Sequence, residues 1–260
     1  MSTQADQSWR QSGQDDPYYA VLTDARFRRS QLTAEHRQAF FETGRQHVDW
    51  VFGLLGKLTG PGFRPARALD FGCGVGRLVI PLAERCQAVV GVDVAPGMLA
   101  EARQNCAERH LENVSFVLSD ATLSQVTGSF DLIHSYIVFQ HIPVAAGRAL
   151  LRQLVSHLEE GGSGALEFLL HRDGSRLRLL GSWLETHVPL FHRGVNLVRG
   201  RPWSEPLMQM NIYTLNALLM DLYAAACDDI QVHLVPHPGA VGAMILFRKH
   251  AALDKTPRQA

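Results

Sequence analysis

The chain has 260 residues, of which 46% are hydrophobic and 19% charged, as is typical of a globular protein with one sizeable core. Its 25 basic and 25 acidic residues give zero formal net charge. This balance argues against nucleic acid as a partner, because phosphate binding needs an excess of basic side chains. No apolar run approaches the roughly 18 residues of a membrane span, and the polar first residues do not resemble a signal peptide. The four cysteines lack metal or redox spacing, so we expect a reduced, cytoplasmic protein without a metal site.

The chain before residue 63 is expected to contain a flexible end and then helices. Residues 1–14 are rich in Gln, Ser and Asp, which predicts a flexible N-terminus. A long helix is predicted from Thr33, a good N-cap residue, to about Leu58, and the segment 60–62, Gly-Pro-Gly, should end it.

A strand, a glycine-rich turn and a helix come next. Residues 66–71 are an apolar run that predicts a buried parallel strand. Gly72, Gly74 and Gly76 then predict a turn whose bare backbone and free N–H groups face a ligand. Residues 77–85 are compatible with the following helix.

The residues around this turn favour one kind of nucleoside cofactor over another. The apolar run 88–92 ends at Asp93, about twenty residues downstream, where a carboxylate can accept both ribose hydroxyls. A dinucleotide-binding loop would have its third glycine where Arg77 stands. Asp70, just before the turn, would repel a pyrophosphate but attract a ligand that carries an ammonium and a sulfonium.

The segment 70–76 therefore resembles the first motif of the class I S-adenosylmethionine (SAM)-dependent methyltransferases. Asp93, residues 119–121 and residues 130–133 resemble three further motifs, in the family's order. The resemblance is strong over residues 66–170 and loose over 210–248. It implies SAM as cofactor and S-adenosylhomocysteine (SAH) as product. The cofactor-binding residues that it implies are Asp70, Gly72, Cys73, Gly74, Gly76, Asp93, Val94, Met98, Asp120, Ala121 and Ser135.

The same resemblance implies an α/β fold with a Rossmann-like, seven-stranded, mostly parallel sheet and helices on both faces. We place the methyltransferase domain at residues 63–248, with an antiparallel C-terminal strand pair over 230–247 and a tail at 249–260. An N-terminal helical segment, residues 15–62, is expected to form a lid, in which Tyr18 or Tyr19 either covers the cofactor or packs on the domain surface. Residues 171–210 are too long for a connection and carry several bulky apolar side chains, so we expect an insertion after the fifth strand that caps the acceptor.

Methyl transfer from a sulfonium is an in-line displacement, for which alignment supplies much of the acceleration. A base is needed only when the acceptor must lose a proton. The segment after the fourth strand provides the catalytic candidates His141, Gln140 and Tyr136. We predict His141 as the base, because an imidazole titrates near pH ~6.5. In the alternative interpretation His141 only bonds the backbone beside Pro143, and His134 is expected to be structural.

These observations predict methyl transfer to an oxygen or nitrogen of a small-molecule acceptor, of the natural-product or sugar type, by a monomer or a homodimer. An RNA or protein methyltransferase is the alternative. Against it, residues 135–138 read Ser-Tyr-Ile-Val where many amino-group methylating relatives have Asn-Pro-Pro-Tyr. A non-catalytic cofactor-binding protein is a third possibility, against which the three carboxylates of Asp70, Asp93 and Asp120 argue.

Overall fold

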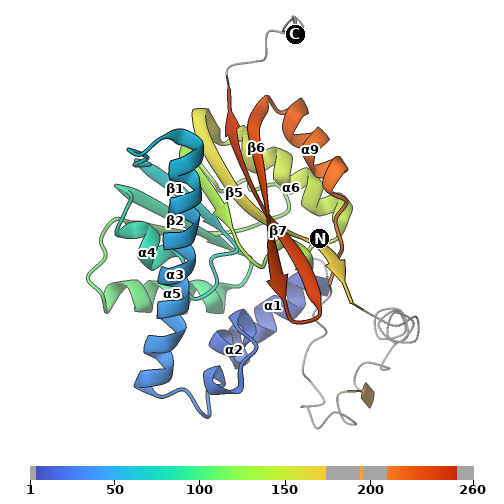
Figure 1. Ribbon diagram of the computed structural model, residues 1–260. Coiled ribbons are helices and arrows are strands. Elements are labelled where there is room, and N and C mark those ends of the chain that lie inside the picture. Colours follow the sequence, from blue (N-terminus) through green and yellow to red (C-terminus); the bar gives the residue numbers. More distant parts are fainter. Residues whose placement is uncertain (1–3, 174–193, 196–209, 251–260) are drawn as a thin grey trace, which may run out of the picture.

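Seven strands form one sheet in the order β3-β2-β1-β4-β5-β7-β6 (Figure 1). The computed structural model describes residues 4–173, 194–195 and 210–250. The strands are β1 (Arg67–Phe71), β2 (Ala88–Asp93), β3 (Val114–Leu118), β4 (Phe130–Ser135), β5 (Leu158–Arg172), β6 (Cys227–His237) and β7 (Ala240–Lys249). The first five pair in parallel, and β7 runs antiparallel to both β5 and β6. The predicted Rossmann-like sheet with a C-terminal hairpin is thus confirmed.

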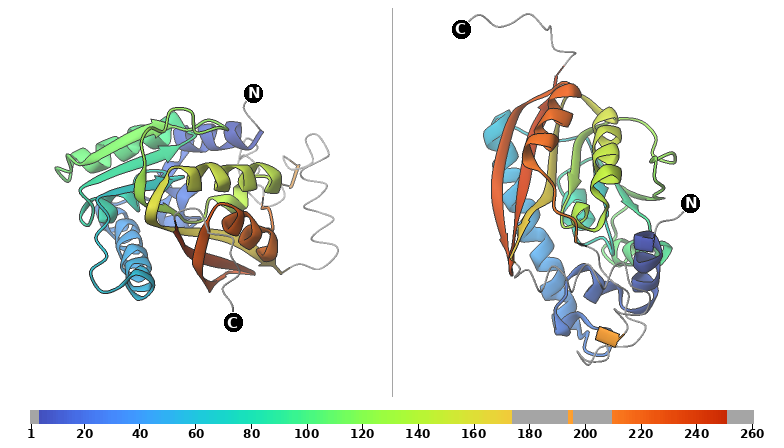
Figure 2. Two further views of the ribbon diagram at one scale, coloured as in Figure 1. Left: turned by 90° about the horizontal axis from the view of Figure 1, so that it is seen from above. Right: turned by 90° about the vertical axis from the view of Figure 1, so that its right-hand side faces the viewer.

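Helices cover both faces of the sheet (Figures 1 and 2). They are α1 (Gln4–Asp15), α2 (Pro17–Val21), α3 (Ala34–Thr59), α4 (Val79–Ala83), α5 (Pro96–Ala107), α6 (Val144–Ser156) and α9 (Leu215–Ala224), with short 3-10 helices η1 (Ala25–Phe27) and η2 (Phe139–His141). Neighbouring strand residues point to opposite faces. In β1, for example, Ala68 packs in the core with α3, α4 and α5, whereas Leu69 packs in the core with α6 and α9.

Helix α3 begins and ends where the sequence predicts. The Thr33 hydroxyl accepts a hydrogen bond from the His36 N–H at 3.2 Å, which caps the first turn. At the other end Gly60 has φ +110°, a conformation that favours glycine and stops the helix. Phe40 and Leu55 are both fully buried in the core that α3 shares with β1, and the Phe40 ring also meets Tyr18 and Phe27.

The N-terminus differs from the expectation, because residues 4–15 form α1 instead of a flexible end. The reason is packing that composition does not reveal. Ser12 and Gly13 are buried against α5, where a Cβ added at Gly13 would lie 3.1 Å from Met98 Cγ. In the reverse direction, a Cβ added at Gly97 would lie 2.6 Å from the Gly13 carbonyl oxygen. Two glycines therefore let α1 dock closely on the start of α5.

Two other boundaries also differ from the sequence prediction. Helix α4 covers only Val79–Ala83, because residues 72–78 continue the turn and Pro81 offers no N–H to a longer helix. The apolar spacing over residues 151–158 predicts a helix that Gly161 and Gly162 end, whereas α6 ends at Ser156 and both glycines lie inside β5, next to an irregularity in its pairing with β4. The proposed insertion at 171–210, with Trp183 and Trp203, lies mostly outside the described residues, as does the tail from 251 onward. None of the described helices is long and apolar enough to cross a membrane.

Candidate functional site

A cavity of about 480 Å³ opens at the C-terminal ends of β1, β2 and β4. Its lining comes from the glycine turn, the end of β2 and the loops after β3 and β4, which is where open α/β sheets bind ligands. Helix α1 adds Asp6, Trp9 and Arg10, and α2 adds Ala20 and Val21. The N-terminal helices therefore form one wall of the site.

The glycine turn needs its glycines for two reasons. Gly72, Gly74 and Gly76 have φ of +75°, +53° and +84°, which side-chain-bearing residues rarely adopt. In addition, a Cβ at Gly72 would lie 2.3 Å from Val138 Cγ2, and one at Gly74 would lie 2.8 Å from Val21 Cγ2. Gly72, Cys73 and Gly74 all line the cavity, whereas Gly76 faces Ala102 of α5 and does not.

The first three N–H groups of this turn are not free, contrary to the expectation. The N–H groups of Gly72 and Cys73 donate to the Val92 carbonyl at 2.7 and 3.0 Å, and that of Gly74 donates to Asp93 Oδ2 at 2.9 Å. A phosphate cradle needs such donors to be available. These three donors are therefore unavailable to a phosphate, as suits a cofactor without phosphate groups.

Asp93 lies at the end of β2 with its carboxylate at the edge of the cavity. Oδ1 accepts the Ala95 N–H at 2.9 Å and Oδ2 accepts the Gly74 N–H. Burial raises the pKa of Asp93 to about 6, although these backbone donors favour the ionised form. Val94, Met98 and Ala121, which the family resemblance implies as cofactor-binding residues, line the same cavity.

Besides Gly76, two predicted cofactor-binding residues, Asp70 and Ser135, do not line the cavity, because their side chains are buried behind the turn. Asp70 is 1% exposed, and its Oδ1 lies 2.8 Å from His134 Nδ1. Its Oδ2 has no hydrogen-bond partner in the described part of the chain. Ser135 is fully buried and donates to the Phe71 carbonyl at 2.9 Å. Both side chains thus hold the strands behind the turn.

Asp120 lines the cavity, but its carboxylate is already bonded within its own loop. It accepts the N–H groups of Thr122 and Ser124 at 2.8 and 3.0 Å and the Ser124 hydroxyl. These donors, the Ser124 hydroxyl first, lower the pKa of Asp120. The family resemblance implies that Asp120 accepts a hydrogen bond from an adenine amino group, and this bond would have to share a carboxylate that already shapes the loop.

His141 is buried at the wall of the cavity, beside helix α1. Its ring meets Trp9 edge-on with the centroids 5.0 Å apart, and Gln140 Nε2 lies 3.2 Å from its Nε2. Gln140 itself does not line the cavity. Tyr136 does, and burial, followed by the nearby Glu167, raises its pKa to about 12. Tyr136 is therefore protonated at neutral pH and can donate a hydrogen bond but cannot act as a base.

Behind Tyr136 lies a buried polar cluster that the sequence does not predict. His134 Nε2 is 3.0 Å from His47 Nε2, and the His47 ring stacks on Tyr136 with the centroids 3.8 Å apart. Burial, with His134 next in importance, lowers the pKa of His47 to about 2, so His47 is neutral. Arg77 is also buried here and lines the cavity, and its guanidinium carbon is 5.6 Å from the Tyr136 ring centroid.

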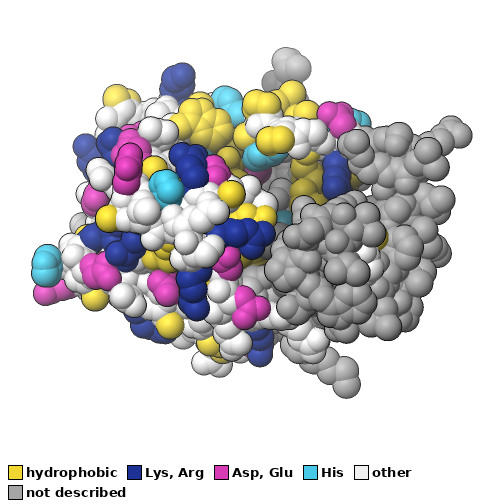
Figure 3. All heavy atoms as spheres, turned by 90° about the horizontal axis from the view of Figure 1, so that it is seen from below, with side chains coloured by type: hydrophobic (Ala, Val, Ile, Leu, Met, Phe, Trp, Pro, Cys, Tyr) yellow, Lys and Arg dark blue, Asp and Glu magenta, His cyan; other side chains and the backbone are white. Residues whose placement is uncertain are grey.

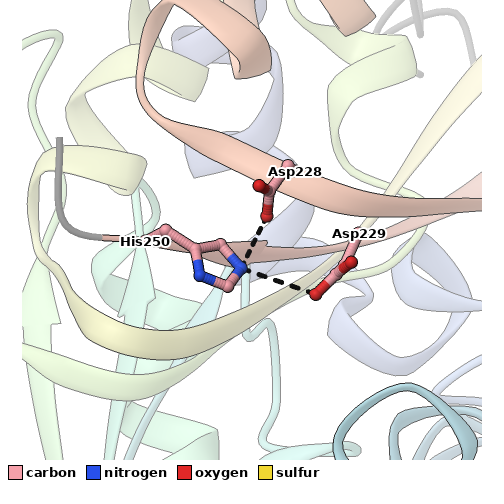
Figure 4. A group of neighbouring side chains, drawn as sticks. All are labelled: Asp228, Asp229 and His250. Carbon is pink, nitrogen blue, oxygen red and sulfur yellow. Dashed lines mark ion pairs between the residues drawn. The ribbon is translucent and has the colours of Figure 1, made fainter. Parts of the chain in front are cut away.

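In the described part of the chain, one group of side chains could offer three ligand atoms to a metal ion: Asp228, Asp229 and His250 (Figure 4). His250 Nε2 lies 2.5 Å from Asp228 Oδ1 and 3.5 Å from Asp229 Oδ2. These two contacts of the His250 ring with neighbouring carboxylates account for the arrangement. The group joins the start of β6 to the end of β7. These strand ends lie at the end of the sheet opposite the cavity.

Comparison with known proteins agrees with this geometry. A family profile described as "Methyltransferase domain" matches residues 68–162. Aklanonic acid methyltransferase DauC of Streptomyces sp. (strain C5) is 34% identical over 168 residues, which cover 62% of this chain and 71% of that enzyme. A 23S rRNA (uracil(1939)-C(5))-methyltransferase, RlmD of Shewanella amazonensis, is 35% identical over 113 residues, but these cover only 23% of that enzyme.

The fold is also that of a solved methyltransferase. Magnesium protoporphyrin IX methyltransferase (ChlM) from Synechocystis PCC 6803, crystallised with SAH, superimposes with a TM-score of 0.60 at 19% identity, covering 94% of this chain and 97% of that one. Three observations agree on one assignment: the first three N–H groups of the glycine turn are bonded within the protein, a carboxylate lies at the end of β2, and the match to DauC is extensive. The chain belongs to the class I SAM-dependent methyltransferases, and SAM is its cofactor.

Proposed function

We propose that this enzyme transfers the methyl group of SAM to an oxygen or nitrogen of a small-molecule acceptor. The observation that carries this proposal is the cavity, one wall of which comes from α1, where Trp9 lies against His141. A site walled by α1 and α2 on one side and by the loop after β4 on the other suits a small acceptor better than a folded RNA or protein.

Two further observations favour a small molecule over RNA. The match to DauC, whose name gives aklanonic acid as its substrate, extends over 71% of that enzyme, whereas the match to RlmD covers 23%. Furthermore, on the described part of the face that carries the cavity, Lys and Arg side chains are interspersed with Asp and Glu (Figure 3). RNA binding would call for a basic face instead.

The residues present fit the cofactor, because Gly72 and Gly74 line the cavity without side chains and Asp93 lines it beside them. In this proposal Asp93 accepts the ribose hydroxyls, Val94, Met98 and Ala121 contact the adenine, and residues 72–74 leave room for the methionine part. When bound, SAM supplies the electrophilic methyl group. Residues 63–248 form the methyltransferase domain, and the helices before them form its lid.

For the chemical step we propose that the protein mainly aligns the acceptor. His141 takes a proton from an acceptor that must lose one, and for this step its Nε2 has to give up the 3.2 Å contact with Gln140 Nε2. Tyr136 donates a hydrogen bond to the acceptor, because its raised pKa keeps the hydroxyl protonated.

The test is a transfer assay with methyl-labelled SAM and three acceptor panels: small aromatic acids, phenols and amines; total RNA; and a protein lysate. We expect label in the small-molecule panel alone. Label in RNA or protein, with none in the small molecules, would refute the proposal. Calorimetry with SAH on the same preparation shows whether an inactive sample still binds cofactor.

A further inference from the structure

The loop that follows β4 contains a residue in an unfavourable conformation. Ile137 has φ +61°, in the left-handed region that β-branched residues rarely occupy. Ile137 and both of its neighbours, Tyr136 and Val138, line the cavity. A conformation of this kind persists only when the surrounding structure holds it.

Glu167 of β5 provides that hold. It is 3% exposed, and its Oε2 accepts the Ile137 N–H at 2.9 Å. Its Oε1 lies 2.5 Å from Nε2 of His237, at the end of β6. In β7, Gly242 leaves room for the carboxylate, since a Cβ there would lie 2.6 Å from Glu167 Oε1. Three strands thus build one buried acceptor for the Ile137 N–H.

The residues on either side of Ile137 transmit its position to the cavity. Val138 packs against the glycine turn so closely that a Cβ at Gly72 would lie 2.3 Å from Val138 Cγ2. Tyr136 is stacked on His47. A shift of the Ile137 backbone would therefore move a side chain that supports the glycine turn and another that faces the acceptor.

We propose that Glu167 is a positioning residue for methyl transfer: it holds residues 136–138 in the conformation that shapes the cofactor cavity and presents Tyr136. The place of Tyr136 beside an acceptor rests on the proposed function. The role of Glu167 in fixing residues 136–138 at the cavity wall does not rest on that function. SAH affinity is therefore the primary readout, because it does not depend on the acceptor.

The variants separate this role from simple stabilisation. Glu167→Met keeps much of the side-chain volume but removes the acceptor of the Ile137 N–H, whereas Glu167→Gln keeps one acceptor oxygen. Ile137→Asn introduces a residue that tolerates the left-handed region. Glu159→Met, an exposed position on the same strand whose carboxylate bonds only the Ser129 hydroxyl among the described residues, is the matched control.

Calorimetry with SAH should show that Glu167→Met weakens binding by about tenfold or more, which corresponds to the usual cost of one strained residue. Glu167→Gln and Glu159→Met should stay within about threefold of the unaltered protein. The double variant Glu167→Met with Ile137→Asn should bind SAH almost as tightly as Ile137→Asn alone, because Asn adopts the left-handed conformation without the help of the Glu167 carboxylate. Unchanged affinity in Glu167→Met, or a loss that Ile137→Asn does not relieve, would overturn the proposal.

A measurement on the unaltered chain keeps the proposal falsifiable if Glu167→Met does not fold. In hydrogen exchange the Ile137 amide should be protected both with and without SAH, because its acceptor is buried. Exchange of this amide at the rate of an open loop would also overturn the proposal. If SAH binding behaves as expected while no small molecule is methylated, the proposed acceptor class fails and the role of Glu167 stands.

Discussion

Replacing Asp93 with Asn tests the cofactor site with the smallest change in shape. The carboxylate accepts two backbone N–H groups, from Gly74 and Ala95, each at 2.9 Å. In the proposed site it also accepts the ribose hydroxyls. A carboxamide has a single acceptor oxygen, so it cannot serve these donors in the same way. We expect weaker SAH binding without loss of the fold.

The size of the effect follows from the bonds lost. A hydrogen bond to a charged group contributes roughly 1.5–3 kcal/mol, so losing the equivalent of one such bond should raise the dissociation constant of SAH by roughly 10- to 150-fold. Freeing the Gly74 N–H would add to the loss, because Asp93 then no longer fixes the glycine turn. The lower end of the range applies if water replaces part of the missing bond.

The pH dependence provides a second, independent signature. Burial raises the pKa of Asp93 to about 6, and only the ionised form accepts both hydroxyls without competition from its own proton. SAH affinity should therefore be flat above pH 6 and fall by about tenfold for each unit below it. In the cofactor-free protein the contribution of Asp93 to folding stability has the opposite pH dependence. The raised pKa contributes stability that is present below the unfolded value of 3.8 and is lost as the pH rises to about 6.

Calorimetry with SAH between pH 5 and about pH 7.5, on the unaltered protein and on Asp93→Asn, checks both points. Asp120→Asn is the control for the slope, because the pKa of Asp120 is lowered and that carboxylate does not titrate in this interval. Equal SAH affinities in the unaltered protein and Asp93→Asn at pH 7 would remove Asp93 from the site. A slope that persists in Asp93→Asn would assign the titration to another group.

Three further predictions concern the turn, helix α3 and catalysis. Gly72→Ala should abolish measurable SAH binding, because its Cβ would lie 2.3 Å from Val138 Cγ2 at φ +75°; normal binding by calorimetry would contradict the packing described. Gly44→Ala should lower the melting temperature sharply, since a Cβ there would lie 2.2 Å from the Arg77 carbonyl oxygen, whereas Gly53→Ala, with open space around it, should not. His141→Gln should slow single-turnover transfer to an acceptor that must lose a proton by about 10²–10⁴-fold at neutral pH, with the loss shrinking at high pH. An unchanged rate would mean that alignment alone suffices.

Much of the fold could be predicted because its signals are local. The apolar runs at residues 66–71 and 88–92, the N-cap at Thr33 and the C-terminal hairpin each depend on neighbours in the sequence, and each is present. Helix α1 was missed because its polar composition concealed a face formed by Asp6, Trp9, Arg10 and Gly13 at helical spacing. That spacing was the available signal.

The chemistry of the site was harder to predict because its partners are far apart in the chain. Asp70 and His134 are separated by 64 positions, and His134 and His47 by 87, so no local spacing connects them. Likewise, the glycines predicted a turn correctly, but the sequence did not show that the Val92 carbonyl takes up two of its N–H groups. The strand register depends on pairing across the whole sheet, and it decides which backbone N–H groups remain available to bind a ligand.

The place of β7 has a consequence for how this protein is made. β7 is the last strand described, yet it lies between β5 and β6 and pairs with both. During synthesis the strands that carry the glycine turn and Asp93 emerge early and can pair in parallel units. The edge of β5, with the fully buried Leu166 and the almost fully buried Phe168, stays unpaired until residues 240–249 leave the ribosome. An unpaired apolar edge is a template for aggregation. A chain that stalls before residue 240 should therefore depend on chaperones, even though its cofactor half is already complete.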